Sequence, residues 1–187
     1  LSRCFRSKHI DYVKAWRRMY NIAEQLGVTA YNVFVWSPNS VSMPGTEANA
    51  MKNYYPGDMY VDWLGVSCYP PSLSATYPEE RRYPLTLMQG IKQVSADKPI
   101  MISEGGYSST CDHQRWVREW FKLKDEEPRV KAVVWENHEN AENGDRRLQS
   151  DPLALELYKE LVQDPYWLDL IPDAVYSEIE TRKNNSK

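Results

Sequence analysis

Hydrophobic residues recur at intervals of three and four between Ile10 and Leu26, and charged residues occupy the opposite positions. This spacing is the period of an amphipathic helix, so residues 10–26 are predicted to form one. Gly27 follows directly and favours a C-terminal cap, because glycine adopts the left-handed conformation without steric cost. The same period predicts three more helices, over residues 85–94, 113–123 and 153–162.

Short runs rich in β-branched and aromatic residues lie between these helices and are bounded by proline, glycine or asparagine. They predict four strands, over residues 31–36, 61–69, 99–103 and 130–135. Helices and strands therefore alternate along the chain, which is the pattern of a parallel sheet. The strands are apolar throughout, as expected where helices cover one face and a barrel interior forms the other.

Chain length helps to choose between two parallel architectures. A complete (β/α)8 barrel takes about 250 residues, whereas this chain has 187 residues and four predicted strands. We therefore expect an α/β fold that is the second half of a (β/α)8 TIM barrel, since the chain opens on a helix where a first strand would stand. A small open doubly wound sheet is the alternative, but no glycine-rich phosphate loop follows any predicted strand.

Composition narrows the classes of function. No apolar run approaches the ~20 residues of a membrane-spanning helix. The net charge is -3 with scattered basic residues, which argues against a nucleic-acid surface. Cys4, Cys68 and Cys111 have no metal-ligand spacing, so no metal site is expected. The chain has seven Trp and thirteen Tyr but only three Phe. Aromatic rings with a polar edge suit a partly solvated surface that stacks against a ligand, or they fill a large core.

Glu104 is the candidate reactive group. It follows the apolar run Pro99–Ser103, and Gly105 and Gly106 come after it as a predicted turn. A strand that closes on an acidic residue sets a carboxylate at the carboxyl edge of a sheet, where α/β enzymes hold their chemistry. The alternative for a single glutamate is a solvated residue that caps a loop.

Five motifs occur in order along residues 10–160. They are Tyr12–Arg17, Val33–Asn39, Tyr55–Ser67, Ile102–Gly106 and Asp145–Asp151. Together they resemble the carboxyl-terminal half of glycoside hydrolase family 26, a family of mainly endo-β-1,4-mannanases on a (β/α)8 barrel with catalytic glutamates after strands four and seven. Five motifs in the same order are far more specific than one short match.

The resemblance implies that the four predicted strands are barrel strands five to eight. Glu104 then matches the retaining nucleophile, and Tyr69 matches the tyrosine that hydrogen-bonds it. Trp135 matches the aromatic floor under the sugar that is cleaved. Trp36, at the end of the strand-five segment, has a weaker claim to line the cleft.

The resemblance also implies an activity and a domain division. Residues 1–163 would be a partial glycoside hydrolase barrel, and residues 164–187 an appended C-terminal segment with no assigned chemistry. The implied activity is retaining endo-hydrolysis of β-1,4-mannan, with a polysaccharide as substrate and no metal or organic cofactor. An extracellular location is expected because large polysaccharides do not enter cells, although no signal peptide opens this chain.

Two other functions stay open. Within the family, the alternatives to mannan are β-1,3-1,4-glucan and β-1,3-xylan. From another class, the alternative is a non-catalytic carbohydrate-binding module that stacks sugars on Trp36, Trp135, Tyr54 and Tyr55.

The acid/base partner of Glu104 is not found in the sequence. Retaining hydrolysis needs a second carboxyl group about 5 to 5.5 Å from the nucleophile. The family carries it at the end of strand four, and residues 1–9 contain no glutamate. The donor is therefore expected in a missing N-terminal half of the same barrel, and the isolated chain is expected to be inactive and prone to associate through unpaired sheet edges.

Two local glutamates are weaker substitutes for that donor. Glu136 follows Trp135 directly, so if Trp135 points into the barrel mouth, Glu136 should point away. His138-Glu139 lies among asparagines and is better explained as a solvated turn.

Other polar and aromatic residues have structural explanations. Arg146, Arg147 and Asp151 are expected to hold the loop after the last strand by ion pairing rather than to touch substrate. Trp116 and Trp120 lie four residues apart on a predicted helix, so packing against the sheet is expected of both.

Overall fold

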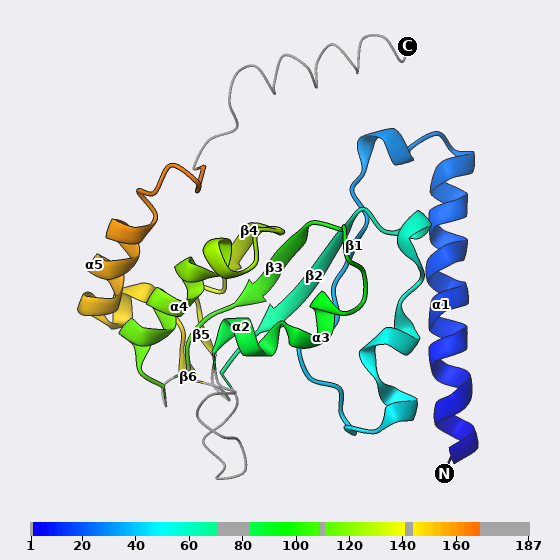
Figure 1. The fold of residues 1–187 in the computed structure, drawn as a ribbon, viewed down its shortest axis with the longest axis horizontal. Coiled ribbons are helices and arrows are strands. Elements are labelled where there is room, and N and C mark those ends of the chain that lie inside the picture. Colours follow the sequence, from blue (N-terminus) through cyan, green and yellow to red (C-terminus); the bar gives the residue numbers. More distant parts are fainter. Residues whose placement is uncertain (1, 71–82, 109–110, 141–143, 169–187) are drawn as a thin grey trace.

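A sheet of parallel strands in the order β1-β2-β3-β4 forms the centre of the computed structural model (Figure 1). The structure describes residues 2–70, 83–108, 111–140 and 144–168. Within them the strands of this sheet are β1 (Val35–Trp36), β2 (Trp63–Cys68), β3 (Ile100–Gly105) and β4 (Val130–Trp135). β1 and β4 form the two edges of the sheet. The predicted parallel α/β sheet is confirmed, and four parallel strands are consistent with part of a barrel.

Five α-helices are found among the described residues. They are α1 (Ser2–Gln25), α2 (Pro84–Leu87), α3 (Gln89–Lys92), α4 (His113–Glu126) and α5 (Pro152–Leu161). Helix α1 begins eight residues before the predicted start, and it ends at a glycine cap because Gly27 has a φ of 67°. The predicted helix over residues 85–94 is two short helices separated at Met88.

The least accurate strand prediction concerns residues 31–36. Thr29–Tyr31 forms the 3-10 helix η1 instead, and β1 keeps only two residues. The side-chain amide of Asn32 donates to the carbonyl of Val28 at 2.7 Å, which closes this turn. A local side-chain bond of this kind competes with strand pairing, and the β-rich composition gave no sign of it.

Short elements complete the described chain. Between β1 and β2 lie the 3-10 helices η2 (Glu47–Asn49), η3 (Met51–Tyr54) and η4 (Asp58–Tyr60). After β4 come a small antiparallel ladder of β5 (Glu139–Asn140) and β6 (Gly144–Asp145), and then η6 (Leu148–Ser150).

The two faces of the sheet have different environments. Residues Leu64, Val66, Ile100, Ile102 and Val130 share the face that the helices cover, and each is fully buried. Trp116 and Trp120 of α4 pack under this face with no exposed surface, which confirms their predicted packing role. The opposite face is more open, since Val134 of β4 is 43% exposed. Helices therefore bury one face, as predicted, and the other face carries the polar groups described below.

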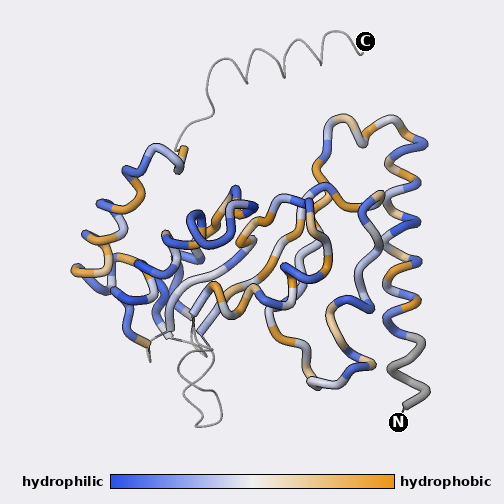
Figure 2. The backbone as a smooth tube through the Cα atoms, viewed as in Figure 1, coloured by the Kyte–Doolittle hydropathy of each residue, from blue (hydrophilic) through white to orange (hydrophobic). Residues whose placement is uncertain are grey.

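Helix α1 packs on the connection between β1 and β2 rather than on the strands. Trp16 Nε1 donates to the carbonyl of Tyr60 at 2.8 Å, and Arg17 Nε donates to the carbonyl of Pro56 at 2.8 Å. Hydrophobic and hydrophilic positions alternate along α1 in Figure 2, and Met19 and Ile22 are 57% and 42% exposed. The helix thus buries only part of its apolar surface within the described residues.

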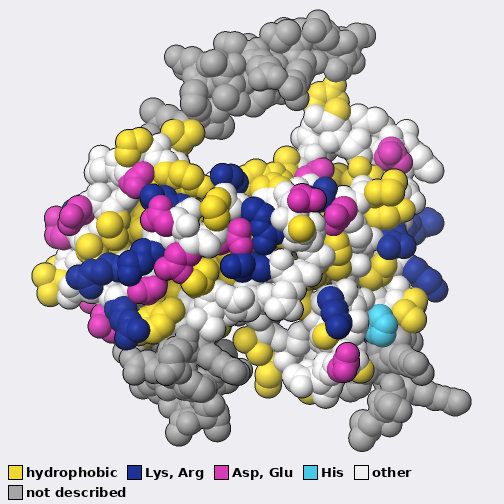
Figure 3. Space-filling model, viewed as in Figure 1, with side chains coloured by type: hydrophobic (Ala, Val, Ile, Leu, Met, Phe, Trp, Pro, Cys, Tyr) yellow, Lys and Arg dark blue, Asp and Glu magenta, His cyan; other side chains and the backbone are white. Residues whose placement is uncertain are grey.

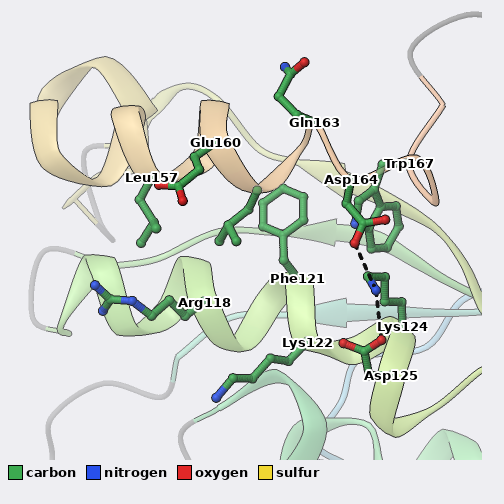
Figure 4. A pocket seen from close by; sticks show the side chains of 11 residues that line it. Arg118, Phe121, Lys122, Lys124, Asp125, Leu157, Glu160, Gln163, Asp164 and Trp167 are labelled. Atoms are coloured by element: carbon green, nitrogen blue, oxygen red, sulfur yellow. Dashed lines mark hydrogen bonds and ion pairs between the residues drawn. The ribbon is translucent and has the colours of Figure 1, made fainter.

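Residues just after α5 pack back on α4. Trp167 meets Phe121 edge-on with ring centroids 5.7 Å apart, and Tyr166 Oη donates to the carbonyl of Val130 at 2.6 Å. A groove of about 670 Å³ runs between α4 and α5, with Phe121, Leu157 and Trp167 on its walls (Figure 4). The predicted appended segment begins here, and its residues 169–187 lie outside the described residues.

Glu127 holds the amino-terminal edge of the sheet, and its charge makes stability depend on pH. Hydrogen bonds from Arg129, and then the Lys92 ammonium 3.2 Å away, lower the pKa of this buried carboxyl from 4.5 to about 2. A lowered folded-state pKa stabilises the fold above the unfolded pKa, and this contribution is lost as the pH falls. We expect the free energy of unfolding to fall by up to about 3 kcal/mol between pH 5 and pH 2.

Urea titration at several pH values measures this loss. Glu127→Gln removes the titrating group, so the variant should be less stable at pH 7 and should lose less between pH 5 and pH 2. An equal loss in the variant would mean that other carboxyl groups cause the acid sensitivity.

Candidate active site

Glu104 and Tyr69 meet at the carboxyl edge of the sheet. Tyr69 Oη donates a hydrogen bond of 2.6 Å to Oε1 of Glu104. Glu104 is an exposed residue of β3, and Tyr69 is a half-buried residue directly after β2. The structure therefore brings together two of the four predicted site residues. A bond to an ionised acceptor is roughly twice as strong as a neutral one, so it fixes both side chains.

An extra residue in β3 turns Glu104 toward the open face. Side chains alternate along a strand, so Glu104 would otherwise share the helix-covered face of Ile100 and Ile102. Instead Val66 pairs with Ile102 and Ser67 pairs with Glu104, which leaves one residue of β3 unpaired. A β-bulge of this kind re-aims the side chains that follow it, and bulges are common beside active sites.

Gly105 is the residue that the bulge brings under the helices. A Cβ atom at this position would lie 2.5 Å from the carbonyl oxygen of Cys68 and closer still to the ring of Trp120. Neither Gly105 nor Gly106 has a positive φ, and Gly105 is the last residue of β3. The predicted Gly-Gly turn is therefore wrong: the first glycine is needed for close packing of the strand against α4.

Two carboxylates act on the Tyr69 phenol. Burial has the largest effect, and hydrogen bonding to Glu104 and Glu136 adds to it, so the pKa of Tyr69 lies far above its ordinary value. The phenol therefore keeps its proton at neutral pH, and it acts as a hydrogen-bond donor. This donor orients the Glu104 carboxyl group, the side chain that could attack an electrophile.

Glu136 is the centre of a second cluster beside this pair. Arg146 Nη1 donates to Oε2 of Glu136, and Nδ1 of His138 lies 3.1 Å from Oε1. The Arg146 guanidinium lies over the Tyr69 ring, with Cζ 4.1 Å from the centroid. The cluster is thus continuous with the Tyr69–Glu104 pair.

Trp135 and Glu136, neighbours at the end of β4, have different partners. Trp135 packs against the rings of Trp120 and Tyr158, at centroid distances of 5.4 and 5.7 Å, on the side of α4 and α5. Since neighbours on a strand point to opposite faces, Glu136 then points toward Tyr69. Glu136 was expected to point away only if Trp135 pointed into the barrel mouth, and Trp135 instead packs on the side of α4 and α5. Trp135 is half-buried, and its contact with a sugar stays a prediction.

Trp36 lies apart from this group. It is 1% exposed, in β1, and packs edge-on against Tyr55 with centroids 5.1 Å apart. The polar residue that follows it, Ser37, instead faces the open side and hydrogen-bonds Ser103. A role for Trp36 in lining the cleft stays a prediction.

The loop after β4 is held by ion pairs, as predicted. Arg147 donates to both oxygens of Asp145 at 2.8 and 2.7 Å. Asp151 accepts from the backbone N–H groups of Leu153 and Ala154 at the start of α5 and lies 2.9 Å from Nδ1 of His113. His138 and Glu139 are exposed, and Glu139 starts the β5–β6 ladder. Arg146 forms an ion pair with Glu136, as predicted, but its contact with the Tyr69 ring was not predicted, because the sequence showed only two adjacent arginines.

The described cysteines Cys68 and Cys111 are unbridged, and Cys68 is buried. The described part of the chain holds no group of three or more His, Cys, Asp or Glu side chains arranged for a metal ion. None of its helices combines the length and apolar character needed to cross a bilayer. On the face seen in Figure 3, basic and acidic side chains are interspersed.

A family model and a curated relative match this chain. The model of the family described as Glycosyl hydrolase family 26 matches residues 4–121, which include Tyr69 and Glu104. Endoglucanase H of Acetivibrio thermocellus is 26% identical over 155 residues, which are 81% of this chain and 17% of that protein. The chain therefore spans a small part of that relative.

Solved structures share the fold. The catalytic domain of a Bacillus sp. JAMB-750 endo-β-1,4-mannanase has a TM-score of 0.56 at 19% identity, over 86% of this chain and 45% of that one. A β-mannanase from Bacteroides ovatus has a TM-score of 0.54 at 20% identity, over 86% and 45%. The chain spans less than half the length of each.

Proposed function

The chain belongs to glycosyl hydrolase family 26, and from this premise we propose that it is the nucleophile-bearing part of a retaining endo-β-1,4-mannanase. The observation that carries the proposal is the exposed Glu104 carboxylate at the carboxyl edge of a parallel sheet, with the Tyr69 hydroxyl 2.6 Å away. Active sites of (β/α)8 barrels lie at this edge. A carboxylate that is exposed and oriented by a hydrogen bond suits nucleophilic attack.

In the proposed reaction a carboxylate oxygen of Glu104 attacks the anomeric carbon of a β-mannosyl unit. The bond from that carbon to the leaving oxygen breaks, a carboxylic acid gives this oxygen a proton, and a glycosyl-enzyme ester forms. Water then attacks the same carbon and releases the sugar with its configuration retained. Tyr69 would hold the nucleophile, and Trp135 and Trp36 are the remaining proposed substrate contacts.

We further propose that this barrel part is the carboxyl-terminal half, with β1 to β4 as barrel strands five to eight. Residues 1–163 would form it, and residues 164–187 would be appended. The open face of the sheet and the exposed apolar residues of α1 offer surface on which four further βα units would pack. The acid/base carboxyl group would belong to those units, and the whole enzyme would act outside the cell on a polysaccharide.

A glucan is the second candidate substrate, because the curated relative is named as an endoglucanase while the similar solved structures are named as mannanases. Both sugars would be cleaved by the same nucleophile. The choice between mannan and glucan therefore depends on the groups that contact the sugar ring and not on Glu104.

Covalent trapping tests the proposal. The intact natural polypeptide is incubated with 2,4-dinitrophenyl 2-deoxy-2-fluoro-β-mannobioside or with the matching cellobioside, whose leaving group departs as a stable anion without a proton donor. We expect mass spectrometry of peptides to find a fluorosugar on Glu104, formed faster with the mannobioside. A faster cellobioside reaction would favour the glucan, and a label elsewhere or none would reject Glu104 as nucleophile.

We also expect the isolated 187 residues to be inactive and to associate. Without a proton donor they should show no measurable hydrolysis of mannan, and sedimentation should show self-association through unpaired strand edges. Hydrolysis of mannan by this chain alone would contradict the proposed division of the catalytic groups.

A further inference from the structure

Tyr69 and a second carboxylate, Glu136, share the Arg146 guanidinium, which donates to Glu136 and lies over the Tyr69 ring. The Tyr69 hydroxyl donates to Oε1 of Glu104 at 2.6 Å, and Glu136 acts on the same phenol, as the raised pKa of Tyr69 reflects. A phenol has one proton to donate, and an ionised carboxylate has none to offer in return. A Glu136 carboxylate without its arginine partner would therefore compete with Glu104 for this one hydrogen bond.

Both oxygens of Glu136 already face a nitrogen. Arg146 Nη1 donates to Oε2, and Nδ1 of His138 lies 3.1 Å from Oε1. The Arg146 side chain is 8% exposed and that of Glu136 is 17% exposed, so water screens the pair little. His138 is 56% exposed and contributes less. The arginine is thus the main partner that satisfies the competing carboxylate.

Arg146 also contacts Tyr69 itself. Its guanidinium carbon lies 4.1 Å from the centroid of the Tyr69 ring, which is the distance of a cation–π contact. Its carbonyl accepts a 3.0 Å hydrogen bond from Trp135 Nε1, which anchors the backbone to β4. One residue therefore fixes the ring of Tyr69 and occupies the carboxylate that would divert its hydroxyl.

We propose that Arg146 is a positioning residue that, by engaging Glu136 and the Tyr69 ring, keeps the Tyr69 hydroxyl bonded to Glu104. This inference rests on the proposed role of Glu104 as nucleophile. It assigns Glu136 as the group that Arg146 neutralises, rather than as the proton donor of the reaction.

The test compares a single variant with a double variant in the intact natural polypeptide. The rate of trapping at Glu104 by the dinitrophenyl fluoromannobioside is measured over a range of reagent concentrations. In this step a Glu104 oxygen bonds to the anomeric carbon as the dinitrophenolate leaves with the electrons of the broken bond. Arg146→Met frees Glu136 to compete, so the maximal rate should fall about 10-fold, with little change in half-saturating concentration.

The double variant Glu136→Gln, Arg146→Met removes the competitor together with its partner. Its rate should recover to within about threefold of the natural protein, since a neutral amide accepts a weaker hydrogen bond than a carboxylate. Arg146→Lys should lose less than Arg146→Met, because a cation still faces Glu136. Arg118→Met, an exposed arginine of α4, is the control and should react at the natural rate.

Recovery in the double variant separates positioning from simple packing, because a packing role predicts a double variant at least as impaired as the single. Crystal structures give a second measure that needs no reagent. Tyr69 Oη should stay within hydrogen-bond distance of Glu104 in the double variant and turn toward Glu136 in Arg146→Met. The inference would be overturned if the double variant did not recover its trapping rate, or if the Tyr69 hydroxyl had not moved in Arg146→Met. If Glu104 were not labelled in the natural protein, the proposed nucleophile would be rejected instead.

Discussion

Glu104→Gln should lower the rate of mannan hydrolysis by the intact natural polypeptide by a factor on the order of 10³ or more. The amide has the shape of the carboxylate and can still accept the Tyr69 hydrogen bond, but it lacks the charge that attacks the anomeric carbon. Because the residue is exposed, the free energy of unfolding should change by less than about 0.5 kcal/mol. Reducing-sugar release and thermal melting measure the two effects.

Glu47→Gln is the matched control. The Glu47 side chain is 92% exposed and pairs with Lys52 at 4.0 Å, so this variant should hydrolyse mannan at the natural rate. Azide distinguishes a nucleophile from a proton donor: with an activated aryl mannoside, Glu104→Ala should regain activity and release the α-glycosyl azide. If Glu104→Gln hydrolysed mannan at the natural rate, Glu104 would not be the nucleophile. If the natural protein bound the sugar without hydrolysing it, and Glu104→Gln bound it equally well, a binding module would be favoured.

Gly105→Ala should reduce the free energy of unfolding by about 3 kcal/mol. The added methyl group would overlap the Trp120 ring and lie 2.5 Å from the backbone oxygen of Cys68. Neither neighbour is the free end of a flexible side chain, since Trp120 is fully buried and the oxygen belongs to β2. The strand or α4 must shift, and the bulge that presents Glu104 should shift with it.

The adjacent glycine supplies the control for this prediction. A Cβ at Gly106 would meet its nearest atoms at 3.6 Å, an ordinary contact, and its φ is not positive. Gly106→Ala should therefore change the free energy of unfolding by less than about 1 kcal/mol. Urea denaturation compares the two variants. If both lost the same free energy of unfolding, the close contacts of Gly105 would not be the reason for a glycine at this position.

Much of the framework followed from the period of the hydrophobic pattern. The strand over residues 130–135 was predicted to the residue, and α4 and α5 begin within one residue of their predicted starts. These segments have long or strongly apolar patterns, so burial of one face decides their structure. Residues 31–36 were predicted less well, because a local hydrogen bond from Asn32 outweighs a short β-rich composition.

The orientation of site residues was harder to predict, and the last strand shows why. Simple alternation correctly placed Trp135 and Glu136 on opposite faces, but it could not say which face each would take. The aromatic rings of α4 and α5 attract the tryptophan, and Arg146 offers a partner to the glutamate. Both causes come from residues distant along the chain.

The sequence by itself determined the order of strands and helices, the family, and the choice of Glu104 and Tyr69 as candidate residues, because these depend on local periodicity and on short motifs. Only the tertiary structure decided that Glu104 faces the open side, through one extra residue in β3, and that Arg146 and Glu136 join Tyr69. A bulge depends on how neighbouring strands pair and how α4 packs beneath them, so one strand's sequence does not contain it.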